Sequence, residues 1–351
     1  MRPFHYERGR SVTTSIATHG GGKATEYLGG GTDLVELMKM DAVVPSRVVD
    51  VHRIDELRTI QVDDSFEDRR DFATSGDNAS IGWRIGAAVT MAELAEHDGV
   101  AASHPLLRTA LRKGATPQVR HLATLAGNLL QRTRCVYFRT GGFACNRRVP
   151  GSGCAALDGD HSSHAILGGS DRCIAVAPSD FAVACVAAGV EIELLGPDGA
   201  RRRPVEGLHR LPGETPHEET ELRPGELITH LIVPPHPGGG SAYEKVPAAG
   251  FAEASAAVAL SLGPDGRVAM ARIALGGLAT VPWRAHAAEA ALIGEQPTHQ
   301  STSAAADAEL VAATTDGQTE HKRTLGGTVL SRAVVRAAER AGRSGAEGGT
   351  Q

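Results

Sequence analysis

Residues 26–39 read EYLGGGTDLVELMK, and this stretch sets the architecture expected for the N-terminal part of the chain. Residues 26–28 predict a short strand, three glycines follow, and Thr32 caps a segment with an acidic first turn and apolar residues at helical spacing. Residues 47–51 (RVVDV) predict a second strand. Together these segments form a compact βαβ-like unit.

A second glycine turn lies in residues 123–130, ATLAGNLL. In both turns, backbone N–H groups are exposed near a helix start, and glycine lets a ligand approach the chain closely. Two such turns together are suited to clamping a pyrophosphate, whereas each one alone is more simply explained as a tight turn. Neither turn has the G-x-G-x-x-G or P-loop spacing, which argues against a Rossmann or P-loop site.

Four cysteines, Cys135, Cys145, Cys154 and Cys173, lie within 39 residues. The segment that holds them is rich in Gly, Ser, Arg and Pro and lacks long apolar runs, so it cannot bury enough surface to order itself. Four thiolates that converge on one inorganic centre would order it. Spacing alone favours an iron–sulfur cluster and a four-cysteine zinc site equally, with a disulfide pair as a third option.

Several other reactive residues are most simply explained as structural or solvated. Cys185 lies in an apolar helix, where a buried inert thiol is expected. His161 and His164 lie among the cysteines, but four thiols already suffice as ligands. Considered alone, Asp180 is the first-turn acid of a helix capped by Ser179, and Lys245 is an ordinary surface lysine.

The composition is that of a globular protein, with 41% hydrophobic and 22% charged residues. A net charge of -5 gives no basic footprint for nucleic acid, and no apolar run is long enough for a membrane span. The first 20 residues lack the apolar core of a signal peptide, so we expect no Sec-type signal and reduced thiols. Hydrolase and metalloprotease motifs are missing from the sequence.

The remaining elements follow from periodicity and capping signals. We expect strands at 80–88, 190–194, 227–233 and 267–275, helices at 90–93 onward, 105–113 and after Ser179, and Ala-rich helices over 282–341. Residues 63–80 are polar and predict a loop or hairpin, and the prolines and glycines at 234–240 predict a linker.

Taken in order, the motifs resemble a known family. The segments are MRPFHY, LGGGTDLVELMK, RVVDV, ATPQVRHLATLAGNLLQ, PSDFAVA, YEKV and LGGLATVPWRA. Over nearly the whole chain they resemble the FAD-binding (medium) subunits of molybdenum hydroxylases of the xanthine dehydrogenase and carbon monoxide dehydrogenase family. The cysteine segments NLLQRTRC, ACNRRVPGSGCAA and HAILGGSDRC resemble the periplasmic aldehyde oxidoreductase branch, whose flavin subunits carry an extra [4Fe–4S] cluster.

The resemblance implies an α+β fold: a vanillyl-alcohol-oxidase (PCMH)-type two-part FAD-binding domain followed by a smaller α+β C-terminal domain. We place the FAD-binding domain at 1–236, with parts 1–62 and 63–236 and the cysteine-rich insert at 130–175. The C-terminal flavoprotein domain is placed at 241–341, and 342–351 are expected to be a disordered tail.

The resemblance also implies site residues, carried over by motif. The cofactor-binding set would be Leu28, Gly29, Gly30, Gly31, Thr32, Asp33, Leu34, Ala115, Thr116, Gln118, Thr124, Gly127, Asn128, Leu167, Asp180 and Lys245. Cys135, Cys145, Cys154 and Cys173 would ligate the [4Fe–4S] cluster. The sequence departs from the family in its LGGG turn, at Ala126, and in PAAGFAEAS after YEKV, which weakens the assignment of Lys245.

The function implied is electron transfer, with no catalytic residue in this chain. It would accept electrons from a small [2Fe–2S] subunit, serve a large molybdenum-cofactor subunit, and pass electrons from FAD to an external acceptor. The alternatives are the flavin subunit of a 4-hydroxybenzoyl-CoA reductase-like enzyme, which has a related insertion, and a zinc-binding scaffold subunit. The expected location is the cytoplasm, or the periplasm through co-export with a signal-bearing partner.

Overall fold

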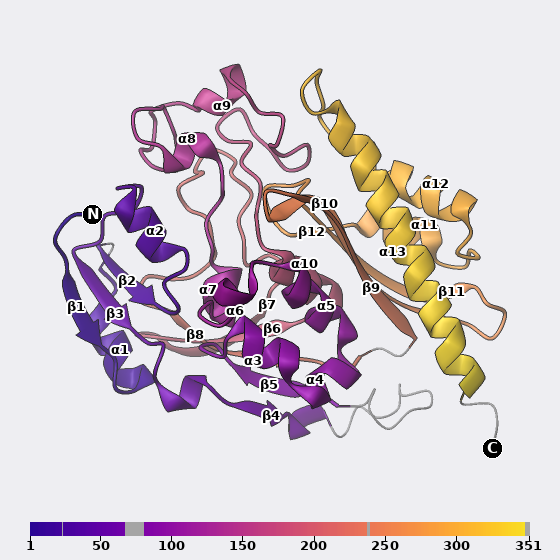
Figure 1. Ribbon diagram of the computed structural model, residues 1–351, viewed down its shortest axis with the longest axis horizontal. Coiled ribbons are helices and arrows are strands. Elements are labelled where there is room, and N and C mark those ends of the chain that lie inside the picture. Colours follow the sequence, from indigo (N-terminus) through magenta and orange to yellow (C-terminus); the bar gives the residue numbers. More distant parts are fainter. Residues whose placement is uncertain (23, 67–80, 237–238, 348–351) are drawn as a thin grey trace.

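The computed structural model describes residues 1–22, 24–66, 81–236 and 239–347. The chain is built around three β-sheets, and it runs through them from one side of the molecule to the other (Figure 1). Each sheet carries helices, which confirms the expected α+β class. Across the described ranges, no helix combines the length and the apolar character that a bilayer crossing needs.

The first sheet has the order β1-β3-β2, and all of its strands are parallel. Its strands are β1 (His5–Arg8), β2 (Thr25–Leu28) and β3 (Arg47–Asp50), joined through α1 (Val12–His19) and α2 (Leu34–Lys39). The predicted βαβ unit at 26–51 is therefore confirmed. The predicted Thr32 cap is wrong, because Asp33 occupies the N-cap position of α2.

The second sheet has the order β4-β5-β8-β6-β7 and is antiparallel. Its strands are β4 (Ile60–Val62), β5 (Trp83–Gly86), β6 (Glu191–Gly196), β7 (Gly199–Pro204) and β8 (Leu227–Val233), with the 3₁₀ turn η1 (Asp55–Leu57) before β4. Every residue of the central strand β8 is buried. Most of the polar segment 63–80, namely 67–80, lies outside the described residues.

Six helices belong to this second part, and they lie in front of the sheet in Figure 1. They are α3 (Met91–Glu96), α4 (Asp98–Ser103), α5 (Pro105–Lys113), α6 (Pro117–Arg120), α7 (Leu125–Leu129) and α10 (Asp180–Ala188). Sheet and helices share one apolar core that includes Ile85, Leu107, Phe181 and Leu231. The helix expected from residue 90 onward begins with a capping box between Thr90 and Glu93, and the Ser179 cap is confirmed.

The third sheet has the order β12-β11-β10-β9 and is also antiparallel. Its strands are β9 (Gly240–Ala248), β10 (Phe251–Leu262), β11 (Val268–Gly276) and β12 (Trp283–Arg284). The helices that follow are α11 (His286–Leu292), α12 (His299–Leu310) and α13 (Glu320–Glu347). The tail expected to be disordered from residue 342 is helical through Glu347.

Strands β9 and β10 were missing from the sequence prediction, because their alanines have low strand propensity. The long helix α13 lies along these two strands (Figure 1). A Cβ on Gly240 would overlap the carbonyl oxygen of Ala337 in that helix. Small residues are therefore needed where helix and sheet approach most closely.

The cysteine-rich insert joins α7 to α10 and stands at the top of Figure 1. It holds only two short helices, α8 (Val136–Arg139) and α9 (Ala155–Asp158), within its described residues. His161 Nε2 lies 2.6 Å from an Asp316 carboxylate oxygen, and Lys322 Nζ donates to the Ser163 carbonyl at 3.0 Å. The insert is thus fastened to the C-terminal part of the chain.

Candidate cofactor site

The two glycine turns predicted to hold a pyrophosphate lie against each other. A Cβ on Gly29 would be 2.5 Å from Thr124 Oγ1, and a Cβ on Gly30 would overlap the carbonyl oxygen of Leu122. Gly31 has φ +74, a conformation that favours glycine. The packing of the two turns therefore requires glycine at these positions.

Two cavities adjoin at this contact. One has a volume of about 300 Å³ and the other about 610 Å³, and both are lined by Thr32, Asp33 and Gly127. Volumes of this size suit an extended cofactor. A larger cavity of about 970 Å³ lies between α12 and α13, away from both turns.

Most of the predicted cofactor residues line these two adjoining cavities. The smaller one is lined by Gly29, Gly30, Gly31, Thr32, Asp33, Leu34, Thr124 and Gly127. The larger one is lined by Thr32, Asp33, Ala115, Thr116, Gly127, Asn128, Asp180 and Lys245. Leu28, Gln118 and Leu167 line neither cavity in the described part of the chain. Leu167 is buried in the C-terminal core, where its N–H donates to the Leu278 carbonyl.

A buried polar group forms one wall of the larger cavity. Asp180 accepts from the Tyr243 hydroxyl at 2.5 Å through Oδ1 and from Lys245 Nζ at 2.7 Å through Oδ2. Burial raises the pKa of Asp180, and the charge of Lys245 opposes this effect. Sequence reasoning assigned Asp180 and Lys245 to the site but not Tyr243, although Tyr243 opens the YEKV motif that was noted in the sequence.

Two residues of the same wall have unusual backbones. Ala115 has φ +54 and Ala249 has φ +46, and both line the larger cavity. Among the described residues, the only other non-glycine residue with positive φ is Asp41. Such conformations are disfavoured for residues with a Cβ and tend to occur at functional sites.

The four insert cysteines lie close enough together to influence one another electrostatically. Burial, followed by the charges of Cys145 and Cys173, raises the pKa of the Cys135 thiol to about 11. Burial also raises the pKa of Cys154, as do the charges of Cys173 and Cys145. Cys145 and Cys154 face each other in an antiparallel bridge. All five cysteines of the chain are free thiols, and Cys185 is fully buried in α10 as expected.

Other polar side chains contact two of these sulfurs. Arg147 Nε donates to Cys173 Sγ at 3.3 Å, and His164 Nε2 lies 3.2 Å from Cys135 Sγ. His164 is buried, which lowers its pKa to about 4 and keeps it neutral. In the part of the chain that is described, no three His, Cys, Asp or Glu side chains lie at the spacing of a single metal ion.

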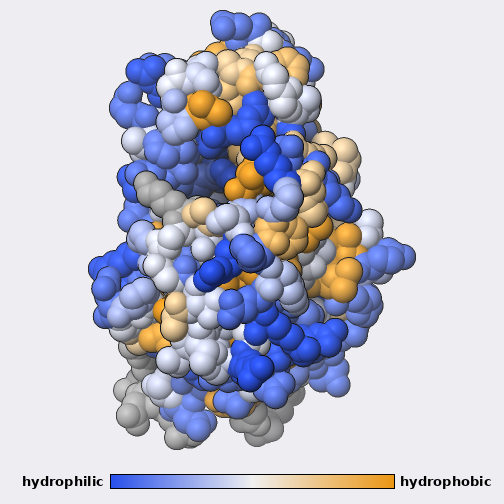
Figure 2. Space-filling view, turned by 90° about the vertical axis from the view of Figure 1, so that its left-hand side faces the viewer, coloured by the Kyte–Doolittle hydropathy of each residue, from blue (hydrophilic) through white to orange (hydrophobic). Residues whose placement is uncertain are grey.

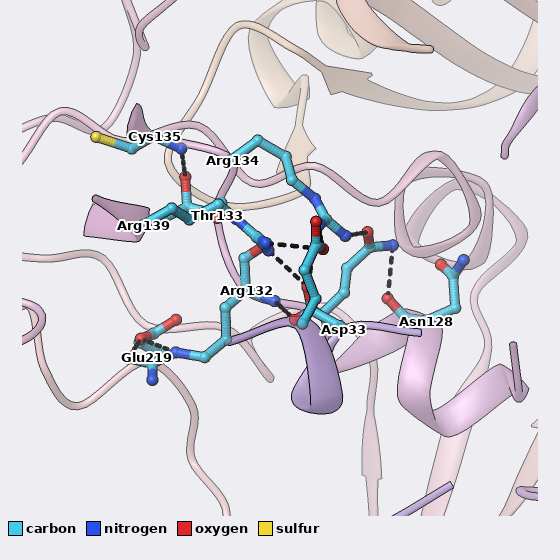
Figure 3. A network of polar contacts seen from close by, with 10 residues as sticks. Asp33, Asn128, Arg132, Thr133, Arg134, Cys135, Arg139 and Glu219 are labelled. Atoms are coloured by element: carbon cyan, nitrogen blue, oxygen red, sulfur yellow. Dashed lines mark hydrogen bonds and ion pairs between the residues drawn. The ribbon is translucent and has the colours of Figure 1, made fainter. Parts of the chain in front are cut away.

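An arginine-rich network connects the insert to the first glycine turn (Figure 3). Asp33 and Glu36 are contacted by Arg134 and Arg139, and Arg132 pairs with Glu219. Sequence reasoning treated none of these residues except Asp33 as functional. The arginines next to the cysteines can be seen in the sequence. Their acidic partners on α2 cannot be assigned from it, because they lie about a hundred residues away in the chain.

The face on the left-hand side of Figure 1 is shown in Figure 2. It is mostly hydrophilic, and its hydrophobic residues form several small groups instead of one continuous patch. The exposed apolar side chains of the insert itself include Val136, Phe143 and Val149. Scattered exposed apolar residues of this kind are normal on a protein surface.

Comparison with known proteins matches residues 2–236 to the family described as FAD binding domain in molybdopterin dehydrogenase. Residues 241–337 match the CO dehydrogenase flavoprotein C-terminal domain. The aldehyde oxidoreductase FAD-binding subunit PaoB of Escherichia coli (strain K12) is 41% identical over 294 residues, covering 83% of this chain and 86% of PaoB.

More distant relatives cover nearly the whole chain. The carbon monoxide dehydrogenase medium chain of Afipia carboxidovorans is 28% identical, with 96% of this chain and 98% of that one covered. Among solved structures, carbon monoxide dehydrogenase from Hydrogenophaga pseudoflava matches with a TM-score of 0.72 at 27% identity. That match covers 97% of this chain and 99% of the other.

Proposed function

Because the chain belongs to the family of FAD-binding medium subunits of xanthine dehydrogenase and carbon monoxide dehydrogenase, we propose that it is the electron-transfer subunit of a molybdenum-dependent aldehyde oxidoreductase. The observation that carries the proposal is the contact of two glycine turns between two adjoining cavities, where no larger residue fits. The aldehyde assignment draws on the 41% identity to an aldehyde oxidoreductase subunit.

The two cavities suggest how the chain would hold FAD. We assign the diphosphate to the junction at Thr32, Asp33 and Gly127, the adenosine end to the smaller cavity and the flavin ring to the larger one. Bound FAD would supply the redox chemistry, since it accepts and releases electrons. Lys245, on the wall of the larger cavity, would stabilise negative charge near the ring.

The proposal includes a [4Fe–4S] cluster held by Cys135, Cys145, Cys154 and Cys173. The donor set fits in kind, because all four are free thiols and the charges of Cys145 and Cys173 act on both Cys135 and Cys154. Burial raises the pKa of the Cys135 and Cys154 thiols, so a positive metal centre would be needed to hold them as thiolates. A single tetrahedral zinc needs all four sulfurs about 2.3 Å from one ion, whereas a four-iron cluster is wider.

Substrate oxidation would belong to a large molybdenum-cofactor subunit, and a small [2Fe–2S] subunit would deliver electrons to this chain. An external acceptor would take them from the flavin. The proposal keeps residues 1–236 as the FAD-binding domain and 241–341 as the C-terminal domain. Location follows the partners: the cytoplasm, or the periplasm when a signal-bearing partner is exported with this chain.

The test is a UV–visible spectrum with flavin, iron and zinc analysis of the complex, co-expressed with its neighbouring subunits and purified without oxygen. We expect one FAD per chain and about four irons beyond those of the [2Fe–2S] partner. Zinc in place of iron, without flavin, would contradict the proposal and favour the scaffold alternative. A large partner that reduces a coenzyme A thioester would reverse the direction of electron flow.

A further inference from the structure

The insert contacts the first glycine turn through one acidic residue of that turn, Asp33. The Oδ1 atom of Asp33 lies 2.6 Å from Arg139 Nη2 and 3.1 Å from Arg134 Nη1. The Oδ2 atom accepts the backbone N–H of Arg132 at 2.8 Å. Figure 3 shows these groups converging on Asp33 from the insert side. Three insert residues, Arg132, Arg134 and Arg139, therefore hold a single carboxylate.

The same arginines reach one turn further along α2. Glu36 Oε2 lies 3.0 Å from Arg139 Nη1 and 3.1 Å from Arg134 Nη1. The Arg139 side chain is only 9% exposed, and its Nε donates to the Thr133 carbonyl at 2.9 Å. A planar guanidinium spreads its donors over three nitrogens and so reaches two carboxylates and a carbonyl that lie apart, whereas a lysine offers its three donors from a single nitrogen.

Apolar packing strengthens this contact. Leu37 of α2, Phe138 of α8 and Cys145 belong to one small buried cluster. Leu37 is 1% exposed and Phe138 is fully buried. One of the proposed cluster ligands thus packs in the same small core as the helix that follows the glycine turn.

A second line of contacts runs from another cysteine to the turn. Arg147 donates to Cys173 Sγ through Nε and pairs with Glu219 at 2.9 Å through Nη1. Glu219 also pairs with Arg132, whose Nε is 2.7 Å away. Burial alone would raise the pKa of Glu219, but the two arginines hold it below its usual range. Glu219 therefore stays charged and links Arg147 to Arg132.

These contacts determine what Asp33 does in the fold. Asp33 occupies the N-cap position of α2, where an aspartate usually accepts from the first helix N–H groups. Its carboxylate is turned toward Arg132 and Arg139 instead. The start of α2 and the turn before it are therefore fixed by the insert, which begins about a hundred residues later.

We propose that the insert is a latch for FAD: Arg139 and its neighbours hold the first glycine turn and α2 in the shape that retains the cofactor, and the cluster keeps the latch ordered. This inference rests on the proposed function, because both the FAD seat and the cluster are part of it. It gives the cluster a positioning role that is independent of electron transfer. Loss of the cluster should then release flavin from a site that contains no cysteine.

The first test substitutes the latch in the complete co-expressed complex. R139Q should release FAD at least about tenfold faster during dilution, since it removes buried charge-assisted hydrogen bonds. Its iron content should stay at the wild-type value. R172Q is the matched control, because Arg172 is an insert arginine whose ion-pair partners, Asp171 and Glu214, are both exposed and do not belong to α2. R172Q should release FAD at the wild-type rate.

A second test removes the cluster itself. C154S should lose iron and, with it, most of the flavin after gel filtration. Full FAD retention in an iron-free C154S complex, or in R139Q, would overturn the latch. A wild-type complex with FAD but no iron would instead contradict the cluster assignment in the proposed function, and R139Q would still test the arginine contacts alone.

Hydrogen exchange distinguishes a released latch from a failed fold. In R139Q, amides of α2 at 34–39 should exchange faster, while those of β10 at 251–262 should keep their protection. R139K keeps the charge but replaces the three donating nitrogens of the guanidinium by one, so its FAD release rate should be intermediate. Equal exchange of α2 in wild type and R139Q would also contradict the proposal.

Discussion

Lys245 Nζ lies 2.7 Å from Asp180 Oδ2, and the two side chains are only 4% and 7% exposed. Lys245 comes from β9 in the third sheet, and Asp180 begins α10 beside the second sheet. The pair therefore connects the third sheet to the helices of the second sheet at the wall of the larger cavity. Tyr243 takes the other oxygen of Asp180, so the carboxylate is held from two sides by one strand.

Removing one partner of this pair should destabilise the chain by more than half as much as removing both. D180N or K245Q alone leaves a buried charge without its partner, and each should lower the free energy of unfolding by about 3 kcal/mol. The double variant should lose clearly less than the sum. Thermal or denaturant unfolding of the chain measures the coupling. R210Q, in a surface pair with Glu218, is the control and should change stability by less than about 1 kcal/mol. Additive losses would show that the pair is not coupled.

The contact between the glycine turns should not tolerate a side chain. G30V places a branched side chain where even a Cβ would overlap the Leu122 carbonyl, so the turns must separate. We expect the Kd for FAD to rise at least about tenfold, which corresponds to about 1.4 kcal/mol of lost binding, and the flavin content of the purified variant to fall with it. G317A is the control, because a Cβ there meets no atom within 4 Å. Normal flavin content in G30V would rule out this junction as the binding site of the FAD diphosphate.

The four insert cysteines should be separable from the fifth by iron analysis. C145S should lose the cluster iron, because a serine hydroxyl is a poor substitute for a thiolate ligand. C185A should keep full iron, since Cys185 is buried inside α10. Iron and acid-labile sulfide per chain are the measurements. Unchanged iron in C145S, or iron loss in C185A, would contradict the ligand assignment.

Burial of His104 predicts a specific loss of stability in acid. Burial lowers the pKa of His104 from 6.5 to about 4. Its Nε2 lies 2.8 Å from the Pro234 carbonyl oxygen and its Nδ1 2.9 Å from Ser103 Oγ, which suits the neutral ring. As pH falls below 6.5, the unfolded chain takes up the proton first, so the stability present above pH 6.5 is lost progressively toward pH 4. The expected loss is at most about 3 kcal/mol.

The comparison of wild type with H104Q isolates this contribution from other buried histidines. His209 and His236 also have pKa values lowered by burial. The stability of the wild-type chain should therefore depend on pH more strongly than the contribution of His104 alone. We expect the melting temperature of H104Q to fall less than that of wild type between pH 6.5 and 4. Parallel pH profiles would show that His104 does not stay neutral in the fold.

Local signals in the sequence predicted much of the fold. The βαβ unit, helix α5 and the Ser179 cap depend on periodicity and on side chains within a few residues, and they are confirmed. Strands β9 and β10 were missed for a physical reason. Their alanines are selected by the approach of α13, and nothing within the strands themselves reports that contact.

The candidate site follows the same division. The glycine turns and the four cysteines were found from the sequence. The backbone freedom of glycine and the reactive thiol of cysteine can be recognised without knowledge of the fold. Arg139 and Glu219 were not, because each becomes significant only through a partner far along the chain: Asp33 in one case and Arg147 in the other. Leu167 was carried over by motif, and the structure places it in the C-terminal core.

The order of strands in the second sheet has a consequence for synthesis on the ribosome. Strand β8 pairs with β5 on one side and β6 on the other, although it is the last of the five strands to be made. Until residue 233 has emerged, β5 and β6 each keep an unpaired apolar edge. A nascent chain that stalls within the long stretch before β8 should therefore be prone to aggregation and dependent on chaperones.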